Sequence, residues 1–476
     1  MPNVQAPAWE NIGSDRELTD RECLRIATEL KGIPVYKPTP TPNPSPGEVG
    51  LTKRLADEIE TWEHFAQDAG ERLYHYENGV YKPDGRSVIH RCTQTLLEEL
   101  GLTAKWSSHR AEEVTQYIQT RSRQLLECPP LNRVNLKNGI LDLDTGKLLE
   151  HSPDFVSPIQ LPVVYDPDAT CPAWDKFAED TFPEDAQELA FEIPALLMVP
   201  DLSLQKSLLA IGAGGNGKST YLAALTAFLG RSNVCSVSLH KLESDRFATA
   251  RLLGKLANIC ADLPSSHLAG TSVFKAITGG DTLCAEYKFK PSFDFVPFCR
   301  LVFSANHPPR SSDSSEAFFR RWLTVPFARV FEGGEAIPRP ELDARLGAPE
   351  ELSGVLNKAI KALRQIRKRG GLLESATMKA AHAEFRQATD PLSVWLDRRT
   401  VQDGGLFVMK KALLSAYNQD AQKDGRPSMT PNAMSRALHE LRPNTKDGQR
   451  TVNAKIEWCW LGLGLSSGDE EQVTVP

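Results

Sequence analysis

The sequence predicts an α/β protein with a parallel-sheet core, an α+β domain before it and a small helical domain after it. Three observations support this prediction. An apolar run at residues 207–211 leads through a glycine-rich turn into a helix-like segment, and two more strand-like runs follow. Mixed helix and strand patterns precede this core, and three helix-like segments with a final β-like run follow it. Strands that alternate with helices favour a parallel sheet.

Length and composition narrow the class of protein further. The chain has 476 residues, which is enough for about three folding units with cores of their own. No apolar run reaches the ~20 residues that span a bilayer, and the N-terminus lacks a signal-peptide pattern, so we expect a cytoplasmic protein with no membrane partner. The nine cysteines include no CxxC pair, which predicts reduced thiols and no zinc site. The net charge of -6 means that any nucleic-acid contact must come from local basic patches.

Residues 1–47 predict an N-terminal arm and a linker. A short apolar stripe at residues 15–31 predicts one helix. Six prolines between residues 34 and 46 then favour an extended spacer. We interpret the segment as a disordered arm in preference to a helix that docks on a partner.

Residues 48–200 predict an α+β domain. Helical patterns cover residues 51–68, 88–100 and 111–126. A hairpin is predicted at residues 139–151, with its turn at Asp144, Thr145 and Gly146. The domain shows no paired carboxylates in a strand context and no cysteine cluster, so we favour a structural or oligomerisation role.

The glycine-rich turn predicts a phosphate-binding site. It matches G-x-x-x-x-G-K-[ST] with Gly212, Gly214, Gly215, Asn216, Gly217, Lys218, Ser219 and Thr220. Glycines let backbone N–H groups face a triphosphate at the start of the following helix, predicted at residues 218–229 and ended by Gly230. Lys218 would reach the β and γ phosphates, and the Ser219 hydroxyl would bind Mg²⁺. ATP and Mg²⁺ are therefore the predicted ligands.

Residues downstream of the turn indicate how a nucleotide would be used. A buried run ends in Asp262, where a carboxylate would hold Mg²⁺ or orient the attacking water. A second strand-like run ends in Asn306, whose amide would sense the γ phosphate. Arg320 and Arg321 lie between aromatic residues. Either both are ordinary surface charges, or one of them is an arginine finger that reaches the nucleotide of a neighbouring subunit.

The order of these motifs resembles that of superfamily 3 helicases of the phage and plasmid primase-helicase family. Four blocks carry the resemblance: GAGGNGKST, NICAD, FKAITGGDTLCAEYKFKPSF, and LVFSANHPP followed by EAFFRRWLTVPF. The third block resembles the family's B-prime motif. LKNGILDLDTGKL and LPVVYDPDATCPAWDKF, further upstream, are similar to the domain that precedes the family's ATPase.

This resemblance implies roles for individual residues and for the whole assembly. It implies an AAA+-like P-loop core at residues 201–385, Lys218 and Ser219 for ATP and Mg²⁺, Asp262 as Walker B acid and Asn306 as sensor 1. Arg320 or Arg321 would be the finger. The family usually has Glu in place of Asp262, and the shorter side chain alters the geometry of water activation. The resemblance also implies a hexameric ring that moves 3′ to 5′ on single-stranded DNA.

The resemblance implies that the B-prime block forms a hairpin that points into the central channel of the ring and contacts DNA. Residues 286–290 (EYKFK) interleave aromatic and cationic side chains, which suits phosphate contacts and base stacking without sequence readout. Lys288 is the preferred contact, Lys290 and Tyr287 are weaker candidates, and Lys275 lies in the same block. The alternative is an amphipathic strand whose lysines only face solvent.

The C-terminal part predicts one long helix and a winged-helix-like domain. The helix starts at residue 349 and ends at Gly370 with many basic residues, which suit a helix C-terminus better than a DNA contact. Residues 386–466 predict helices at 392–399, 409–423 and 431–441 and a β-like run at 451–465. This domain would bind DNA through Arg436 and Arg442, or it would bind protein. Residues 467–476 predict an acidic tail.

These predictions combine into an ATP-dependent DNA helicase that opens duplex or forked DNA during replication of a phage, plasmid or integrated element. The domain before the core lacks primase motifs, so a separate primase is the expected partner. One alternative is an ATP-regulated initiator that binds an origin and unwinds little. Another is a protein-remodelling ring ATPase, although the lysine-rich hairpin differs from the aromatic pore loops expected there.

Overall fold

The computed structural model describes residues 46–466 except 265, 269, 312, 314, 332–336 and 424–427. The chain divides into residues 1–54 and 55–476, and only the start of helix α2 (Pro46–Trp62) represents the first unit among the described residues. The predicted helix at 15–31, most of the proline-rich spacer and the acidic tail lie outside the described part. Within that part, no helix combines the length and apolar character needed to cross a membrane.

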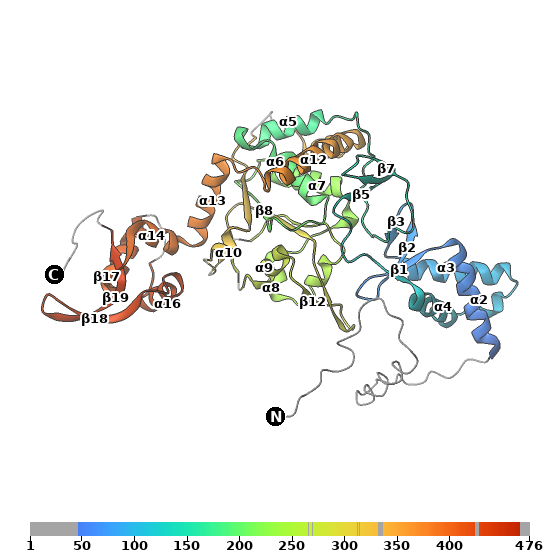
Figure 1. The fold of residues 1–476 in the computed structure, drawn as a ribbon, viewed down its shortest axis with the longest axis horizontal. Helices are drawn as coiled ribbons and strands as arrows, with labels where there is room; N and C mark the ends of the chain where they lie inside the picture. Colours follow the sequence, from blue (N-terminus) through green and yellow to red (C-terminus); the bar gives the residue numbers. More distant parts are fainter. Residues whose placement is uncertain are drawn as a thin grey trace, which may run out of the picture. The chain divides into compact units, whose positions relative to one another are not determined.

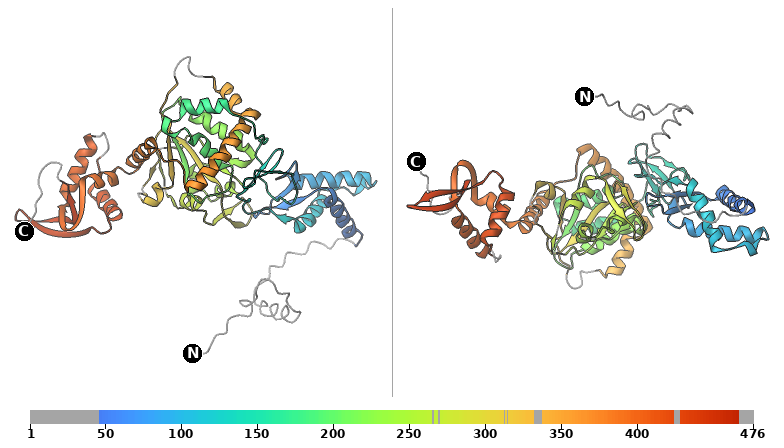
Figure 2. Two further views of the ribbon diagram at one scale, coloured as in Figure 1. Left: turned by 45° about the horizontal axis from the view of Figure 1, so that its top comes forward. Right: turned by 90° about the horizontal axis from the view of Figure 1, so that it is seen from below.

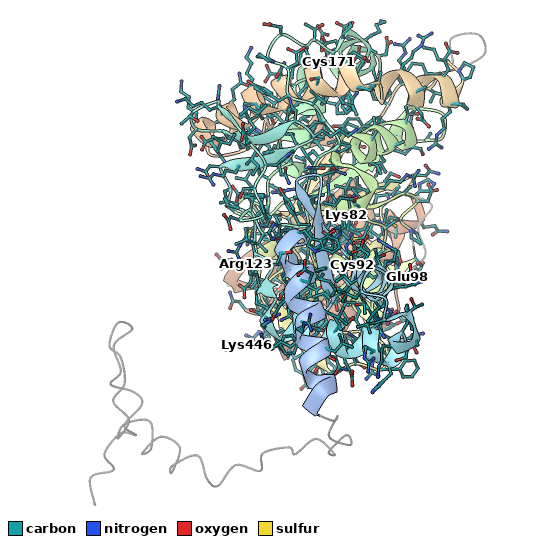
Figure 3. The ribbon with its side chains drawn as sticks, turned by 90° about the vertical axis from the view of Figure 1, so that its right-hand side faces the viewer. Lys82, Cys92, Glu98, Arg123, Cys171 and Lys446 are labelled. Atoms are coloured by element: carbon teal, nitrogen blue, oxygen red, sulfur yellow. The ribbon has the colours of Figure 1, made fainter. Side chains whose placement is uncertain are left out.

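The first module of the second unit is a four-stranded sheet with two helices. The sheet has the order β3-β2-β1-β4, with β1 (Phe65–Gln67), β2 (Leu73–Glu77), β3 (Val80–Lys82) and β4 (Arg123–Gln124). Helices α3 (Gly85–Glu99) and α4 (Ser108–Arg121) agree with the predicted helices at 88–100 and 111–126 except at the end of the second. Lys82 and Arg123, labelled in Figure 3, form ion pairs with Glu77 and Asp154.

Two predicted helix ends in this module were wrong. The helix predicted to reach residue 68 ends at Trp62, and the helix predicted to reach residue 126 ends at Arg121. The residues that follow these two helix ends include strands β1 and β4, which pair with each other in parallel. Strand β1 also pairs with β2. Pairing between segments more than fifty residues apart overrides the local helical pattern.

A small sheet follows and contains the predicted hairpin. Strands β5 (Arg133–Leu136), β6 (Gly139–Asp142) and β7 (Leu148–Leu149) are antiparallel. In the turn, the Asp142 carboxylate accepts the Thr145 backbone N–H at 2.8 Å. The predicted hairpin and turn are therefore confirmed.

The centre of the molecule is a five-stranded parallel sheet (Figure 1). Its order is β16 (Trp322–Pro326), β8 (Ser207–Ile211), β14 (Arg300–Ala305), β10 (Ala257–Cys260) and β9 (Val234–Cys235). Strands β8 and β14 are buried almost throughout, as is typical of a parallel sheet covered on both faces. Strand β8 and helix α7 (Lys218–Leu229) have the predicted bounds, and Gly230 ends α7 with a φ of 85°.

Helices cover both faces of this sheet (Figure 1). One face carries α5 (Pro172–Thr181), α6 (Leu189–Leu197), α7, α11 (Arg339–Leu346) and α12 (Pro349–Arg369). The other carries α8 (Leu239–Ser244), α9 (Ser272–Gly279) and α10 (Glu316–Phe319), with the two-stranded pair β11 (His267–Leu268) and β15 (Arg310–Ser311). Buried residues between 134 and 199 belong to the same core as α7 and α12, so the predicted boundary at residue 200 does not separate two cores.

The basic residues of α12 mostly bind the protein itself. Lys358 pairs with Asp175, and Arg369 pairs with the buried carboxylate of Glu192 at 2.5 Å. Arg364 and Arg367 donate to backbone carbonyls. Helix α12 ends before Gly370, which has a φ of 75°. These contacts support the structural interpretation of this helix over a DNA contact.

The C-terminal module contains the three predicted helices, a hairpin that starts at Lys446 where the β-like run was predicted from residue 451, and one strand that was not predicted. After α13 (Ala376–Thr389) come α14 (Pro391–Arg399), β17 (Thr400–Met409), α15 (Lys410–Lys423), α16 (Pro431–Leu441), β18 (Lys446–Val452) and β19 (Lys455–Leu465). The sheet order is β17-β19-β18, and Figure 2 shows β18 and β19 in red as a long ribbon. Strand β17 was missed because most of its residues are exposed and two adjacent glycines interrupt its alternation.

Candidate functional site

The glycine-rich loop joins the end of β8 to the start of α7. Gly212, Gly215 and Gly217 have φ values of 153°, 70° and 87°, which side-chain-bearing residues rarely adopt. A Cβ atom on Gly212 would lie 2.3 Å from the Phe327 carbonyl oxygen. Gly217 is the N-cap of α7 and offers no capping side chain. The backbone N–H groups at this helix start are therefore available to an anion.

Lys218 lies on the inner side of this loop. Its Nζ donates to the Gly212 and Ala213 carbonyl oxygens, both at 2.6 Å, and to the Asn216 Oδ1 at 2.9 Å. The Asn216 Nδ2 donates in turn to the Phe327 carbonyl oxygen at 2.7 Å. Burial lowers the pKa of Lys218, and the charge of Asp262 partly offsets this effect. The ammonium is thus held by neutral acceptors that an anion can replace.

The remaining predicted loop residues differ in exposure. Gly214, Gly215 and Ser219 are exposed, whereas Thr220 is buried. The exposed Ser219 hydroxyl is at the first turn of α7 and faces no competing acceptor among the hydrogen bonds of the described residues. This loop fits a phosphate group, with Lys218 as cation and Ser219 as a possible metal ligand.

Asp262 and Asn306 lie at the same edge of the sheet as the loop. Ala305 of β14 pairs with Ile211 of β8, and Cys260 of β10 pairs with Phe303 of β14, so all three strands end together. Asp262 and Asn306 follow these ends and are exposed. The Asp262 N–H donates to the Ser304 Oγ at 3.3 Å, and its φ is 55°. The sheet therefore brings Lys218, Asp262 and Asn306 to one edge.

Arg320 and Arg321 lie at the opposite end of the strands. Trp322, which follows them, pairs with Ser207, the first residue of β8, whereas the glycine-rich loop follows its last residue. Arg321 is only 8% exposed and donates to the Ala317 carbonyl oxygen. Burial and the neighbouring Arg320 lower the pKa of Arg321. Arg320 is exposed, so it is the arginine that another molecule can reach.

A pocket of about 370 Å³ opens beside the loop. Its lining includes Gly217, Phe177, Phe331 and Leu342, so most of its walls are apolar. The Phe331 N–H donates to the Gly215 carbonyl oxygen at 3.0 Å and fastens this wall to the loop. The sequence patterns identified only the loop side of this pocket, because the rest of its lining comes from α5, α11 and the chain after β16 and carries no motif.

The B-prime block forms the expected hairpin. Strands β12 (Leu283–Glu286) and β13 (Ser292–Phe295) pair antiparallel, and Lys288 and Lys290 are exposed in the connection. Phe289 lies between them, has a φ of 65° and is 103% exposed. Phe289 belongs to the interleaved run, but the sequence did not single it out as a contact, because only the strand register shows that it lies at the tip.

Tyr287 and Lys275 are less accessible to a DNA strand than the residues at the hairpin tip. The Tyr287 ring packs 5.3 Å from Phe293, and a Cβ atom on Gly70 would lie 2.5 Å from the Tyr287 Cε2. Gly70 itself is held by the Asp68 carboxylate, which accepts its N–H at 2.9 Å. Lys275, on α9, forms an ion pair with Asp313 at 2.5 Å. The hairpin tip is therefore the free part of the predicted DNA contact.

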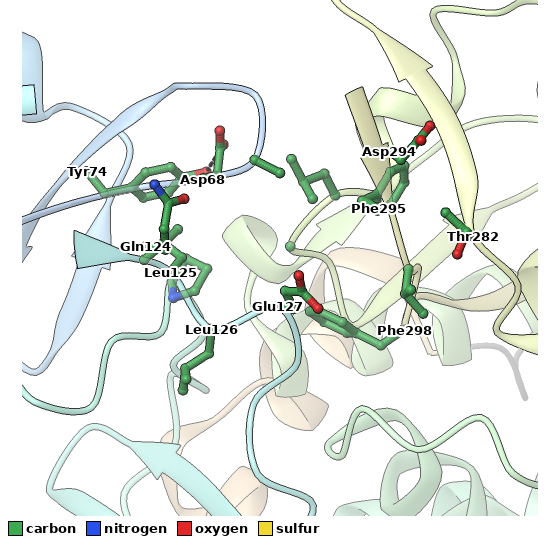
Figure 4. A pocket seen from close by; sticks show the side chains of 15 residues that line it. Asp68, Tyr74, Gln124, Leu125, Leu126, Glu127, Thr282, Asp294, Phe295 and Phe298 are labelled. Carbon is green, nitrogen blue, oxygen red and sulfur yellow. Dashed lines mark hydrogen bonds between the residues drawn. The ribbon is translucent and has the colours of Figure 1, made fainter. Parts of the chain in front are cut away.

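A second pocket lies beside this hairpin base (Figure 4). Its volume is about 370 Å³, and its lining includes Asp68, Tyr74, Phe295 and Phe298. The Tyr74 hydroxyl donates to the Asp68 carboxylate at 3.1 Å, and burial raises the pKa of Asp68. Tyr74 and Asp68 therefore satisfy each other at one wall of the pocket.

The described residues contain no cluster of three or more His, Cys, Asp or Glu side chains that would hold a metal by itself. Magnesium commonly binds through one or two protein groups together with substrate phosphates. Ser219 and Asp262 suit that mode of binding.

Comparisons with known proteins match two segments of the chain. Residues 52–183 match a family model described as D5 N terminal like, and residues 210–321 match a family of unknown function, DUF5906. Two apo structures of the NrS-1 C-terminal region are each 14% identical to this chain, with a TM-score of 0.46. One covers 87% of this chain and 98% of its own, and the other covers 88% and 100%.

Proposed function

We propose that this protein is an ATP-dependent DNA helicase of the superfamily 3 type that acts in phage, plasmid or mobile-element replication. One observation carries the proposal: Lys218, Asp262 and Asn306 share one sheet edge with a glycine-rich helix start. The strand order β16-β8-β14-β10-β9 suits an AAA+-like core. The match of residues 52–183 to the D5 N-terminal-like model supports the resemblance to primase-helicases.

In this proposal, the loop and the adjacent pocket bind ATP. Lys218 and the N–H groups of the loop hold the phosphates, and the apolar pocket with Phe177 and Phe331 takes the base. Ser219 and Asp262 hold Mg²⁺, which neutralises phosphate charge during transfer. Asp262 orients the attacking water, and Asn306 contacts the γ phosphate.

The proposed assembly is a ring, and the position of Arg320 supports it. Five paired residues separate the end of β8 and β16 where Arg320 lies from the end where the glycine-rich loop lies. Each strand residue spans about 3.3 Å, so Arg320 is too far away to reach a nucleotide bound to the loop of the same chain. Arg320 would therefore serve the nucleotide of a neighbouring subunit. The resemblance implies a hexamer.

DNA would be held by the tips of the β12–β13 hairpins in the ring. Lys288 and Lys290 contact phosphates, and the exposed ring of Phe289 stacks on a base. Movement of one subunit against the next on hydrolysis would carry the hairpin and the bound strand. A separate primase is the expected partner in replication.

Strand displacement on a forked DNA tests this proposal. The intact protein should separate the strands with ATP and Mg²⁺, and Lys218→Ala should not, because it loses the phosphate cation. Strict dependence on one DNA sequence together with negligible unwinding would favour an origin-binding initiator. ATPase stimulation by polypeptide but not by DNA would favour protein remodelling. Either result alone would contradict the helicase proposal.

A further inference from the structure

The end of the β18–β19 ribbon in the C-terminal module lies beyond the residues of β19 that pair with β17, and most of its residues are exposed (Figures 1 and 2). Gln449 pairs with Trp458 and Thr451 pairs with Ile456 across the two strands. Asn453 and Ala454 form the tight connection, with φ values of 50° and 62°. Two positive φ values in a two-residue loop are typical of a hairpin turn that holds the strands rigidly in register.

One face of this ribbon exposes two large apolar side chains beside the polar Gln449 and Thr451. Trp458 is 55% exposed and Ile456 is 71% exposed. Trp460, further along the same face, is buried, and the Lys410 ammonium lies 4.0 Å from its ring centre and 5.7 Å from that of Trp458. The module core already contains Trp460, so Trp458 and Ile456 are not needed for its packing.

The other face of the ribbon carries cations together with one carboxylate, because Glu457 lies directly opposite Arg450 in the strand register. Arg450 and Lys455 alternate with Trp458 and Ile456 and point to the opposite side, because successive strand residues face opposite ways. Among the described residues, no carboxylate lies within ion-pairing distance of either cation, and the same holds for Lys446, labelled in Figure 3. The ribbon therefore combines unpaired cations with an exposed indole.

We propose that the β18–β19 ribbon is a second DNA contact, which binds a groove of duplex DNA. A two-stranded ribbon has the width that a DNA groove admits. Arg450, Lys455 and Lys446 contact backbone phosphates, and Trp458 and Ile456 contact sugars and base edges. A protein partner would suit the two apolar side chains alone, whereas the unpaired cations favour a polyanion. This inference extends the proposed helicase function, because duplex lies ahead of a fork.

The sequence had suggested Arg436 and Arg442 for this role, and the structure changes that choice. Arg442 is buried and pairs with Asp397 at 2.6 Å, so it is not free to contact DNA. Arg436 remains exposed on α16. The ribbon was not predicted as a contact, because Trp458 belongs to a β-like run in which burial cannot be read from the sequence.

The test is equilibrium binding of the full chain, without nucleotide, to a short fluorescein-labelled duplex of mixed sequence and to its single strand. The double variant Arg450→Gln with Lys455→Gln should lower the slope of log K against log salt concentration for duplex binding by about 2, because each cation contributes one phosphate contact. Trp458→Ala should weaken duplex binding roughly tenfold or more with unchanged salt dependence, and Trp458→Phe should retain most of the affinity. The control removes two exposed cations of α12, Lys361→Gln with Lys368→Gln, and should change neither quantity.

Unchanged duplex affinity in the ribbon variants would overturn the inference, as would an equal loss in the α12 control. Equal losses on duplex and single strand would overturn the groove assignment. These outcomes are separate from the helicase proposal, which depends on Lys218 and on the β12–β13 hairpin. A ribbon variant with normal duplex binding beside a Lys288→Ala variant that cannot unwind would reject only the ribbon contact.

Discussion

Asp262 is held in a backbone conformation that most residues avoid. Its φ of 55° lies in the left-handed region, which asparagine and aspartate tolerate better than other side-chain-bearing residues. Such conformations often accompany functional sites, and this one lies directly beyond β10 at the loop edge of the sheet.

Asp262→Asn should therefore separate chemistry from folding. Asparagine adopts the same backbone, so we expect an unchanged free energy of unfolding. The lost carboxylate should lower the ATPase rate about 10²-fold or more, because it no longer orients water or holds Mg²⁺. Steady-state ATPase assays and urea unfolding measure the two effects. Asp262→Ala is the comparison, with an added stability cost of about 1 kcal/mol from the backbone. A fully active Asp262→Asn variant would contradict the assigned role.

The hairpin tip allows a second prediction at single residues. Lys288→Ala and Phe289→Ala should each retain the ATPase rate measured without DNA, because both side chains are exposed and remote from the loop in sequence and in contacts. Each should lose unwinding, and Phe289→Ala should weaken single-strand binding by about 1–3 kcal/mol through lost stacking. Phe289→Trp should restore that binding. Normal unwinding by both alanine variants would remove the hairpin from the mechanism.

Helix α6 shows how an irregular element is tied to the candidate site. Pro194 lies inside α6 and has no N–H, so the Ala190 carbonyl lacks its donor within the helix. The Tyr221 hydroxyl, from α7, donates to that carbonyl at 3.2 Å. Tyr221 is fully buried, which raises its pKa well above the usual value, and its ring packs 5.1 Å from Phe182. One hydrogen bond therefore connects α6 to the helix that follows the loop.

Tyr221→Phe should lower the free energy of unfolding by about 1–2 kcal/mol, because it leaves the buried Ala190 carbonyl unpaired. Pro194→Ala supplies a backbone N–H to the same carbonyl. In that background, Tyr221→Phe should cost little, and urea unfolding of the four proteins in the cycle measures the difference. An equal cost in both backgrounds would show that Tyr221 acts through packing alone.

In the proposed ring, assembly would complete the candidate site. Arg320 is exposed at the strand end opposite the loop, so it lies far from the loop of its own chain. In that ring, Arg320 of one subunit would face the nucleotide of its neighbour. Arg321, which is buried and bound to Ala317, has a structural role in the fold.

Mixing inactive subunits tests this arrangement. Arg320→Ala and Lys218→Ala should each abolish ATPase activity alone. Mixed at equal amounts and reassembled, they should recover roughly a quarter of the wild-type rate, because some interfaces join an intact loop to an intact Arg320. No recovery, with mixed oligomers verified by mass, would place the arginine in the same subunit as its nucleotide. Arg321→Ala should lower thermal stability and serves as the comparison for a buried neighbour.

The sequence by itself determined the features that depend on short, contiguous patterns. The bounds of β8 and α7 and the hairpin at residues 139–151 follow from glycine placement, alternation or helical periodicity within one segment. The β12–β13 hairpin was expected from the resemblance of its block to the B-prime motif. The loop residues and the edge position of Asp262 and Asn306 could likewise be predicted, because parallel strands end together at one edge.

Only the tertiary structure decided the features that depend on distant partners. Strands β1 and β4 form because they pair with each other, although the local sequence pattern of their residues predicts helices. The pocket at Phe177 and Phe331, the burial that distinguishes Arg321 from Arg320, and the exposure of Phe289 and Trp458 all depend on which segments cover them. Local patterns specify backbone conformation, whereas burial is a property of packing between segments that the order of residues does not reveal.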